Sequence, residues 1–199
     1  MTSGGPAHVV LDKPAGEAAF LIALTHGAGG MPETPDVLAV RDAARARGAM
    51  TALVTQPYRV KGARAPGSAA RQDAAWTEII AALKAETGMA DVPLVQGGRS
   101  NGARVVCRTA KAVGAVGVIT LAFPLHPPGN PGKSRDAELR EAGTSVLVVS
   151  GDRDPFGVPE PDAVTSVVVL AGETHALSRH PAAVGEAVTQ WLAEVIRLA

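Results

Sequence analysis

Short apolar runs alternate with amphipathic segments along this chain of 199 residues. The apolar runs have the length of strands that are buried on both faces, and they lie at residues 18–24, 52–55, 92–95, 116–121, 146–149 and 167–170. Helical periodicity marks the segments 36–47, Ser68 to Gly88 and 181–198. This alternation predicts an α/β fold, with a mostly parallel central sheet and helices on both faces. Because no internal repeat or linker interrupts the chain, we expect a single domain over residues 1–199.

One of the predicted strands leads into the pentapeptide Gly-Arg-Ser-Asn-Gly at residues 98–102. The run at 92–95 precedes it, and residues 103–107 are typical of a helix. Strand, tight turn and helix form the context in which the motif G-x-S-x-G presents a serine as a nucleophile. The two glycines allow the strained backbone and close packing of such a turn. Ser100 is therefore a candidate nucleophile, although the pentapeptide alone would also fit an ordinary glycine turn.

Polar groups follow two later strands. Asp152 and Asp154 come just after the run at 146–149, and His175 follows the run at 167–170. In a parallel sheet the carboxyl ends of the strands meet at one edge, where ligands usually bind. A serine hydroxyl needs a general base, and an imidazole base needs a carboxylate that fixes its tautomer. The order serine, aspartate, histidine is that of α/β hydrolases, and by position either aspartate could serve.

The first apolar run ends at a glycine-rich loop, His-Gly-Ala-Gly-Gly at residues 26–30. Small residues let backbone N–H groups approach a developing oxyanion, which such preorganised donors stabilise. A phosphate-binding loop is the alternative. The loop lacks the G-x-x-x-x-G-K-[ST] pattern, and Pro32 and Glu33 prevent a G-x-G-x-x-G continuation, so nucleotide binding is disfavoured.

Together these motifs resemble those of α/β hydrolases over nearly the full length of the chain. The sequence is more specifically similar to a small dienelactone-hydrolase-like family, which includes the testis-expressed TEX-thirty type proteins and the hydrolase domain of a chromatin-complex subunit. The motifs that carry this resemblance are T-H-G-A-G-G at 25–30, G-G-R-S-N-G-A-R at 97–104, F-P-L-H-P-P-G at 123–129 and G-D-R-D-P-F-G at 151–157. The family's commoner Ser-Met-Gly-Gly-Arg is Ser-Asn-Gly-Ala-Arg here.

The resemblance implies roles for individual residues. In α/β hydrolases the acid commonly lies three residues after the glycine that ends its strand, which selects Asp154 and leaves Asp152 to brace the turn. The oxyanion donors are the backbone N–H of the residue after the nucleophile and one from the His-Gly loop. The implied catalytic residues are Ser100, Asp154 and His175, and the implied oxyanion donors are Asn101 and Ala28, with Gly29 close behind.

Two segments that carry additional structure in larger hydrolases are short in this chain. Residues 122–144, where a lid is often inserted, hold a Pro/Gly-rich stretch and one short helical segment at 136–141. After Asp154, Pro161 interrupts the only stretch that could form a helix before the last strand. We therefore expect a minimal lid or none, and a shallow, open site.

Four further side chains lie near these motifs. His126 is either a substrate contact or a loop histidine packed among prolines. Arg99 could contact an anionic substrate or form an ion pair at the sheet edge, whereas Arg104 is expected to brace the structure. Cys107 is the only cysteine, which excludes an internal disulfide and a multi-cysteine zinc site. We expect it to be a buried, inert thiol.

Composition restricts the partners. Lys plus Arg and Asp plus Glu both total 19, so no global field attracts nucleic acid or an anionic membrane. No apolar stretch approaches the roughly 18 residues that a bilayer span needs. The chain also opens without a secretory leader pattern, and a cytoplasmic location is the expectation. We expect a small-molecule acyl substrate and neither metal nor organic cofactor, while the oligomeric state is not determined.

These observations favour a serine hydrolase that cleaves an ester, thioester or related acyl bond through an acyl-enzyme. Two alternatives stay open. The scaffold could serve as a non-catalytic interaction module, as the chromatin-subunit relatives suggest. The same three side chains could also support an acyltransferase, which differs only in the acceptor that resolves the acyl-enzyme.

Overall fold

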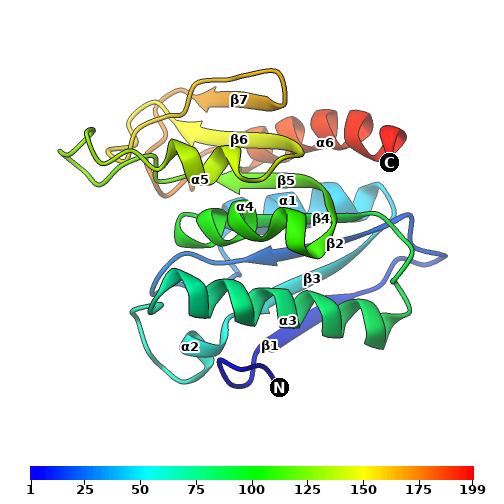
Figure 1. Cartoon of the computed structure of the whole chain (residues 1–199). Coiled ribbons are helices and arrows are strands. Elements are labelled where there is room, and N and C mark those ends of the chain that lie inside the picture. The colour runs from blue at the N-terminus through cyan, green and yellow to red at the C-terminus, as the bar shows by residue number, and fades with distance from the viewer.

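The computed structural model describes residues 1–199 as a seven-stranded sheet between two layers of helices (Figure 1). The strand order is β1-β3-β2-β4-β5-β6-β7. Strand β1 pairs antiparallel with β3, and all other pairs are parallel. The strands are β1 (His8–Asp12), β2 (Phe20–Thr25), β3 (Ala49–Thr55), β4 (Leu94–Arg99), β5 (Ala115–Leu121), β6 (Ser145–Gly151) and β7 (Thr165–Leu170).

Helices cover both faces of this sheet. Helices α1 and α6 pack against each other on one face, while α4 packs between α3 and α5 on the other (Figure 1). The helices are α1 (Pro35–Ala46), α2 (Pro57–Val60), α3 (Ala69–Thr87), α4 (Asn101–Val113), α5 (Asp136–Arg140) and α6 (Pro181–Leu198). The predicted α/β architecture is confirmed.

The core consists of two apolar layers, one on each side of the sheet. Side chains of a strand alternate between its faces, so Leu21 of β2 joins the layer under α3 and α4, whereas Phe20 and Ile22 join the layer under α1 and α6. Strands with apolar side chains on both faces must be covered on both faces. This requirement explains why the buried strands read as continuous apolar runs in the sequence.

The structure adds two elements that the sequence patterns did not predict. Strand β1 (His8–Asp12) lies at the sheet edge and is largely exposed, so it lacks the apolar run that marks a buried strand. Helix α2 (Pro57–Val60) is a single turn inside the segment expected to be a loop. The strand before the pentapeptide begins and ends later than its expected range of 92–95. It runs from Leu94 to Arg99, because the buried strand continues through polar Gln96 and two glycines.

The carboxyl ends of the parallel strands meet at the left-hand edge of Figure 1. The segment between Asp154 and β7 contains no helix, as expected, and the only helix in the segment that replaces a lid is α5. The loops that follow β2, β4, β6 and β7 therefore converge at this edge without a covering domain. Ser100, Asp154, His175 and the glycine-rich loop lie at these positions, Asn101 begins α4, and His126 lies in the segment that follows β5.

Candidate active site

Ser100 occupies a strained turn between β4 and α4. Its backbone angles are φ 52° and ψ −113°, a region that non-glycine residues rarely adopt. A Cβ atom on Gly98 would clash with the backbone of Gly102, and a Cβ on Gly102 would lie 2.5 Å from the carbonyl oxygen of His26. Glycine is thus required at both positions, because the strand, the helix and the loop after β2 approach one another too closely for a side chain.

A continuous line of hydrogen bonds joins Ser100 to Asp154 through His175. The Nε2 atom of His175 lies 2.8 Å from Ser100 Oγ, and Nδ1 lies 2.8 Å from Asp154 Oδ2. A carboxylate can only accept, so Nδ1 carries the proton and Nε2 of the neutral ring accepts from the serine hydroxyl. The carboxyl of Asp154 is fully buried, whereas the imidazole is 21% exposed. This geometry lets the imidazole remove the serine proton while the carboxylate holds its tautomer.

The structure distinguishes the two aspartates that the sequence offered. Asp154 uses its second oxygen, Oδ1, to accept the backbone N–H of Phe156 at 2.9 Å. Asp152 instead accepts the backbone N–H of Gly172 at 2.8 Å. Asp152 thus braces the loop that leads to His175, and Asp154 is the residue in contact with the imidazole.

The His175 imidazole and its loop are held from further sides. The ring of Phe156 lies 4.3 Å from the imidazole, measured between centroids. Deeper in the loop, the buried carboxylate of Glu173 accepts the backbone N–H groups of Arg179 and His180 at 2.7 and 2.6 Å. The loop contains no helix or strand, and these contacts take the place of secondary structure in fixing it.

The glycine-rich loop after β2 approaches the nucleophile at Gly27. A Cβ on this residue would lie 3.2 Å from Ser100 Cβ. The backbone N–H groups of Ala28, Gly29 and Asn101 have no acceptor within the protein. They are therefore free to donate to a ligand, as oxyanion donors must be.

A buried histidine holds this loop in place, and its contacts were not predicted from the sequence. His26 Nε2 accepts the backbone N–H of Gln56 at 3.0 Å, so Nδ1 is the protonated nitrogen and donates to Gly27 O at 2.8 Å. Burial lowers the pKa of His26, which keeps the ring neutral at physiological pH. The ring thus links the end of β3 to the loop beside Ser100.

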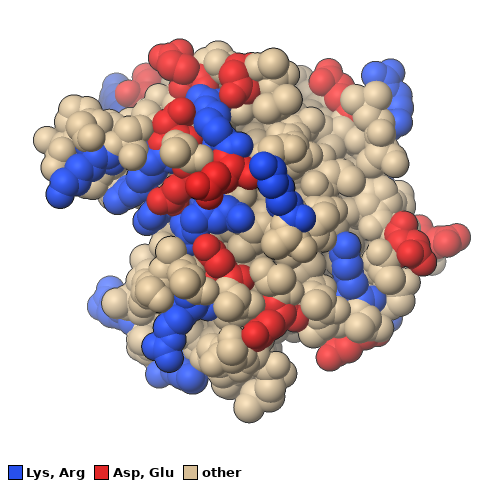
Figure 2. All heavy atoms as spheres, viewed as in Figure 1, with Lys and Arg blue, Asp and Glu red and all other residues tan.

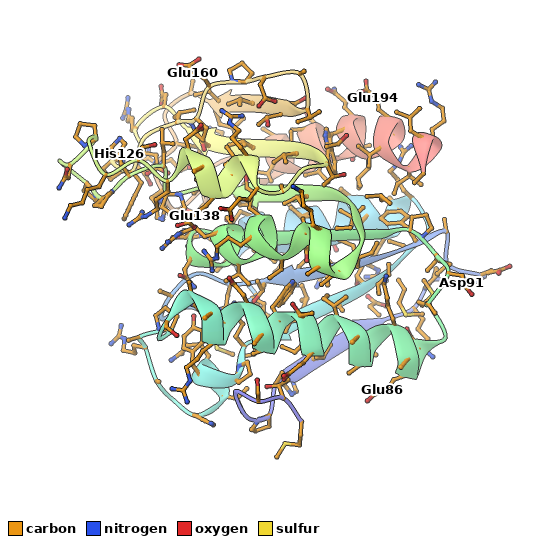
Figure 3. The ribbon with its side chains drawn as sticks, in the orientation of Figure 1. Glu86, Asp91, His126, Glu138, Glu160 and Glu194 are labelled. Carbon is orange, nitrogen blue, oxygen red and sulfur yellow. The ribbon has the colours of Figure 1, made fainter.

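The remaining side chains near the motifs have structural partners. His126 lies at the left of Figure 3, and its Nδ1 atom donates to Pro127 O at 2.9 Å. The imidazole ring also packs against Gly157. Arg99 pairs with buried Asp36 at 3.0 Å. Both side chains thus have partners within the protein. Cys107 is fully buried, and burial raises the pKa of its thiol.

Arg104 belongs to a group of charged side chains that joins three helices. It forms two hydrogen bonds with Glu138 of α5, which also pairs with Arg108, and Arg108 pairs with Asp73 of α3. Burial alone would raise the pKa of Glu138, but the two guanidinium groups hold it below its usual range. Figure 2 shows positive and negative side chains close together over α4 and α5. Arg104 thus braces the structure, as predicted.

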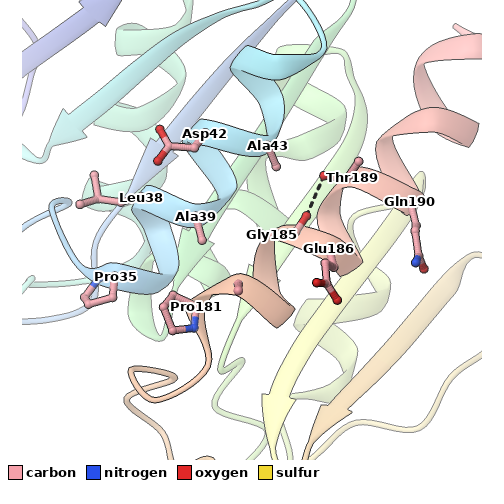
Figure 4. Close-up of a pocket in the computed structure, with 11 residues that line it drawn as sticks. Pro35, Leu38, Ala39, Asp42, Ala43, Pro181, Gly185, Glu186, Thr189 and Gln190 are labelled. Atoms are coloured by element: carbon pink, nitrogen blue, oxygen red, sulfur yellow. Dashed lines mark hydrogen bonds between the residues drawn. The ribbon is translucent and has the colours of Figure 1, made fainter.

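One groove on the surface lies apart from this site. A groove of about 730 Å³ lies between α1 and α6, where Leu38 and Ala39 line one wall and Gly185 and Glu186 the other (Figure 4). The residues that line this groove do not include Ser100, its hydrogen-bonded partners or the glycine-rich loop.

No group of three or more His, Cys, Asp or Glu side chains is placed to hold a metal ion. None of the helices combines the length and apolar character that a membrane crossing needs.

Comparison with known proteins shows where this arrangement belongs. A family model described as an alpha/beta hydrolase domain matches residues 17–180, whereas no curated protein matches the chain. Among solved structures, an alpha-beta serine hydrolase homologue from Coxiella burnetii is 18% identical, with a TM-score of 0.78 over 96% of this chain and 94% of that one.

Two further solved structures agree. XC6422 from Xanthomonas campestris, an α/β serine hydrolase without a lid, is 19% identical with a TM-score of 0.73, covering 98% of this chain and 93% of that one. Dienelactone hydrolase from Anabaena variabilis is 15% identical with a TM-score of 0.75, covering 98% and 94%. At such identities the likeness concerns the fold, a lid-less α/β hydrolase fold. The chain belongs to the alpha/beta hydrolase family.

Proposed function

We propose that this protein is a serine hydrolase that cleaves an ester, thioester or related acyl bond. The observation that carries the proposal is the line of hydrogen bonds from Asp154 through His175 to Ser100. Each imidazole nitrogen lies 2.8 Å from its partner oxygen, Asp154 Oδ2 or Ser100 Oγ. An imidazole hydrogen-bonded between a carboxylate and a serine on a strained turn is the arrangement that activates a hydroxyl as a nucleophile. The esterases and hydrolases among its structural relatives support the same reaction class.

The first half of the reaction forms an acyl-enzyme. Ser100 Oγ attacks the carbonyl carbon of the substrate, and its proton moves to His175 Nε2. The carboxylate of Asp154 stabilises the resulting imidazolium. Negative charge develops on the carbonyl oxygen, which the backbone N–H groups of Asn101 and Ala28 hold, with Gly29 adjacent. His175 then returns the proton to the leaving alcohol or thiol as the tetrahedral intermediate collapses.

The second half releases the acid. Water attacks the acyl carbon, and His175 takes its proton as it took that of the serine. The second tetrahedral intermediate expels Ser100, which regains its proton from the imidazole. Every proton transfer passes through Nε2, so the reaction requires neither a metal ion nor an organic cofactor.

The open edge of the sheet supports a proposal about the substrate class. No lid covers Ser100, and Phe156 is the aromatic side chain that packs beside the imidazole. We propose a small-molecule acyl substrate whose leaving group extends into solvent.

The four motifs that resemble those of the small TEX-thirty type family support placing the chain in that narrower group as well.

Labelling with a fluorophosphonate probe tests the proposal. We expect the folded protein to be labelled at Ser100, and Ser100→Ala to remain unlabelled. A screen of ester and thioester chain lengths, with Ser100→Ala as the blank, then identifies the acyl group. If folded protein is not labelled by probes of any size, the chain is a binding module on the hydrolase scaffold. Transfer of the acyl group to an added alcohol faster than to water would make it an acyltransferase.

A further inference from the structure

Arg99 joins three segments of the candidate active site. It is the last residue of β4 and immediately precedes Ser100. Its Nε atom donates to Asp36 Oδ2 at 3.0 Å, and its Nη2 atom donates to the backbone carbonyl oxygen of His175 at 2.8 Å. One guanidinium therefore connects the turn of the nucleophile, the first turn of α1 and the loop that carries the imidazole.

The surroundings of Arg99 favour this one orientation. The Asp36 side chain is completely buried and that of Arg99 is 19% exposed, so neither partner is freely solvated. A Cβ on Gly27 would lie 3.4 Å from Arg99 Nη1, which means that the guanidinium also passes close to the glycine-rich loop. A planar, permanently charged fork can serve two acceptors in fixed directions, whereas an ammonium group has no such preset geometry.

The hydrogen bond from Arg99 to the His175 carbonyl oxygen bears on the orientation of the imidazole. Its loop has no regular secondary structure, so the imidazole can be directed at Ser100 only if its own backbone is fixed. Asp154 and Ser100 hold the ring nitrogens, but Arg99 holds the backbone of the same residue. Because Arg99 and Ser100 are neighbours in the chain, the Arg99 side chain and one peptide bond connect the backbone of the base to that of the nucleophile.

We propose that Arg99 is a positioning residue, which acts on the reaction by holding the backbone of His175 in register with Ser100. The inference rests on the proposed hydrolase function. Asp36 supports it by orienting the guanidinium, and neither residue needs to touch the substrate. By sequence position Arg99 could contact an anionic substrate or form an ion pair at the sheet edge, and the two hydrogen bonds direct its charge to the protein itself.

Kinetic measurements on p-nitrophenyl acetate test the role of Arg99. We expect Arg99→Met to lower kcat on the order of 10- to 100-fold with KM nearly unchanged, since small misplacements of a catalytic group have effects of this size. Arg99→Lys should recover part of the loss, because an ammonium can satisfy one of the two acceptors. Arg45→Met is the matched control. It removes an Arg–Asp pair with Asp12 toward the far end of α1 and should leave kcat unchanged.

A second background separates positioning from general destabilisation. In His175→Ala protein there is no imidazole to orient, so adding Arg99→Met should cause no further loss of the residual activity. An equal fold-loss in both backgrounds would overturn the inference, as would an unchanged kcat in Arg99→Met protein that remains folded. If Arg99→Met does not fold, the same comparison is made with Arg99→Lys.

A spectroscopic measurement keeps this inference distinct from the proposed function. The proton on His175 Nδ1, shared with Asp154, gives a downfield resonance in proton NMR that is observed without turnover. We expect it in wild-type and Arg45→Met protein, and broadened or absent in Arg99→Met. If wild-type protein hydrolyses no ester but the resonance behaves in this way, the hydrolase proposal fails while the structural role of Arg99 holds. If esters are hydrolysed and the resonance is identical in Arg99→Met, the role of Arg99 is wrong.

Discussion

Asn101 donates a 2.7 Å hydrogen bond from Nδ2 to Gln72 Oε1, which joins the residue after the nucleophile to the first turn of α3. Gln72 is itself buried and donates to the carbonyl oxygens of Gly67 and Ser68. The side chain of Asn101 is therefore committed to the protein, while its backbone N–H has no acceptor. Asparagine stands here where the small family that the sequence resembles more commonly has methionine. Its side chain anchors α4 to α3 and leaves the proposed oxyanion donor intact.

Asn101→Met should accordingly retain activity and lose stability. The oxyanion donor is a backbone group, so we expect kcat within about threefold of wild type. The buried oxygen of Gln72 loses its partner, which should lower the free energy of unfolding by about 1–3 kcal/mol. Urea denaturation and steady-state kinetics on one ester measure both quantities. A large fall in kcat with unchanged stability would show that the Asn101 side chain takes part in the reaction.

The two aspartates after β6 should differ sharply in their effect on catalysis. Asp154→Asn removes the carboxylate that fixes the imidazole tautomer, and we expect kcat to fall by about 10⁴-fold. Asp152→Asn keeps an oxygen that can accept the Gly172 N–H, so its kcat should stay within about threefold of wild type. Both are measured on the same ester at pH 8. The assignment is wrong if Asp152→Asn alone abolishes activity.

Removing the buried imidazole of His26 should change how stability depends on pH. Its folded-state pKa is lowered by burial, so the folded protein disfavours the proton that the unfolded chain accepts. The stabilisation is complete above the unfolded-state pKa of about 6.5 and is lost as pH falls from there through the folded-state pKa. Wild-type unfolding free energy should therefore decline with acidification below that value.

The comparison with His26→Gln isolates this contribution, because other titrating groups are common to both proteins. Urea midpoints between pH 5 and 8 should show a shallower decline in the variant. Parallel curves for the two proteins would mean that His26 takes up a proton in the folded state as easily as in the unfolded chain.

Gly102→Ala should be severe for a steric reason. The new methyl would lie 2.5 Å from the carbonyl oxygen of His26, and the backbone on both sides cannot retreat without opening the elbow. We expect a loss of more than about 3 kcal/mol in unfolding free energy, together with loss of fluorophosphonate labelling. Gly185→Ala is the control. It lies inside α6 with only ordinary contacts, the nearest at 3.7 Å, and should be neutral or stabilising by up to about 1 kcal/mol. Similar losses in both variants would contradict the steric explanation.

Local patterns in the sequence predicted most of the architecture. The strands β2, β5 and β6 are buried on both faces, which forces a continuous apolar composition that is visible in the sequence alone. Helix α3 was predicted between Ser68 and Gly88, and these two residues cap it. Ser68 accepts the Arg71 N–H and Gly88 adopts a positive φ. Strand β1 escaped prediction for the opposite reason, since an exposed edge strand carries no such signal.

By itself the sequence determined the α/β fold, the strained turn at Ser100 and the order of serine, aspartate and histidine at the strand ends. These properties follow from short-range composition and from the rule that parallel strands end at one edge. The family resemblance favoured Asp154 as the acid, but only the tertiary structure showed that Asp154 contacts His175 while Asp152 accepts the Gly172 N–H. The tertiary structure also showed that the charge of Arg99 is directed to Asp36 and to the His175 backbone. Such choices depend on the directions of side chains from loops far apart in the chain, which spacing along the sequence does not encode.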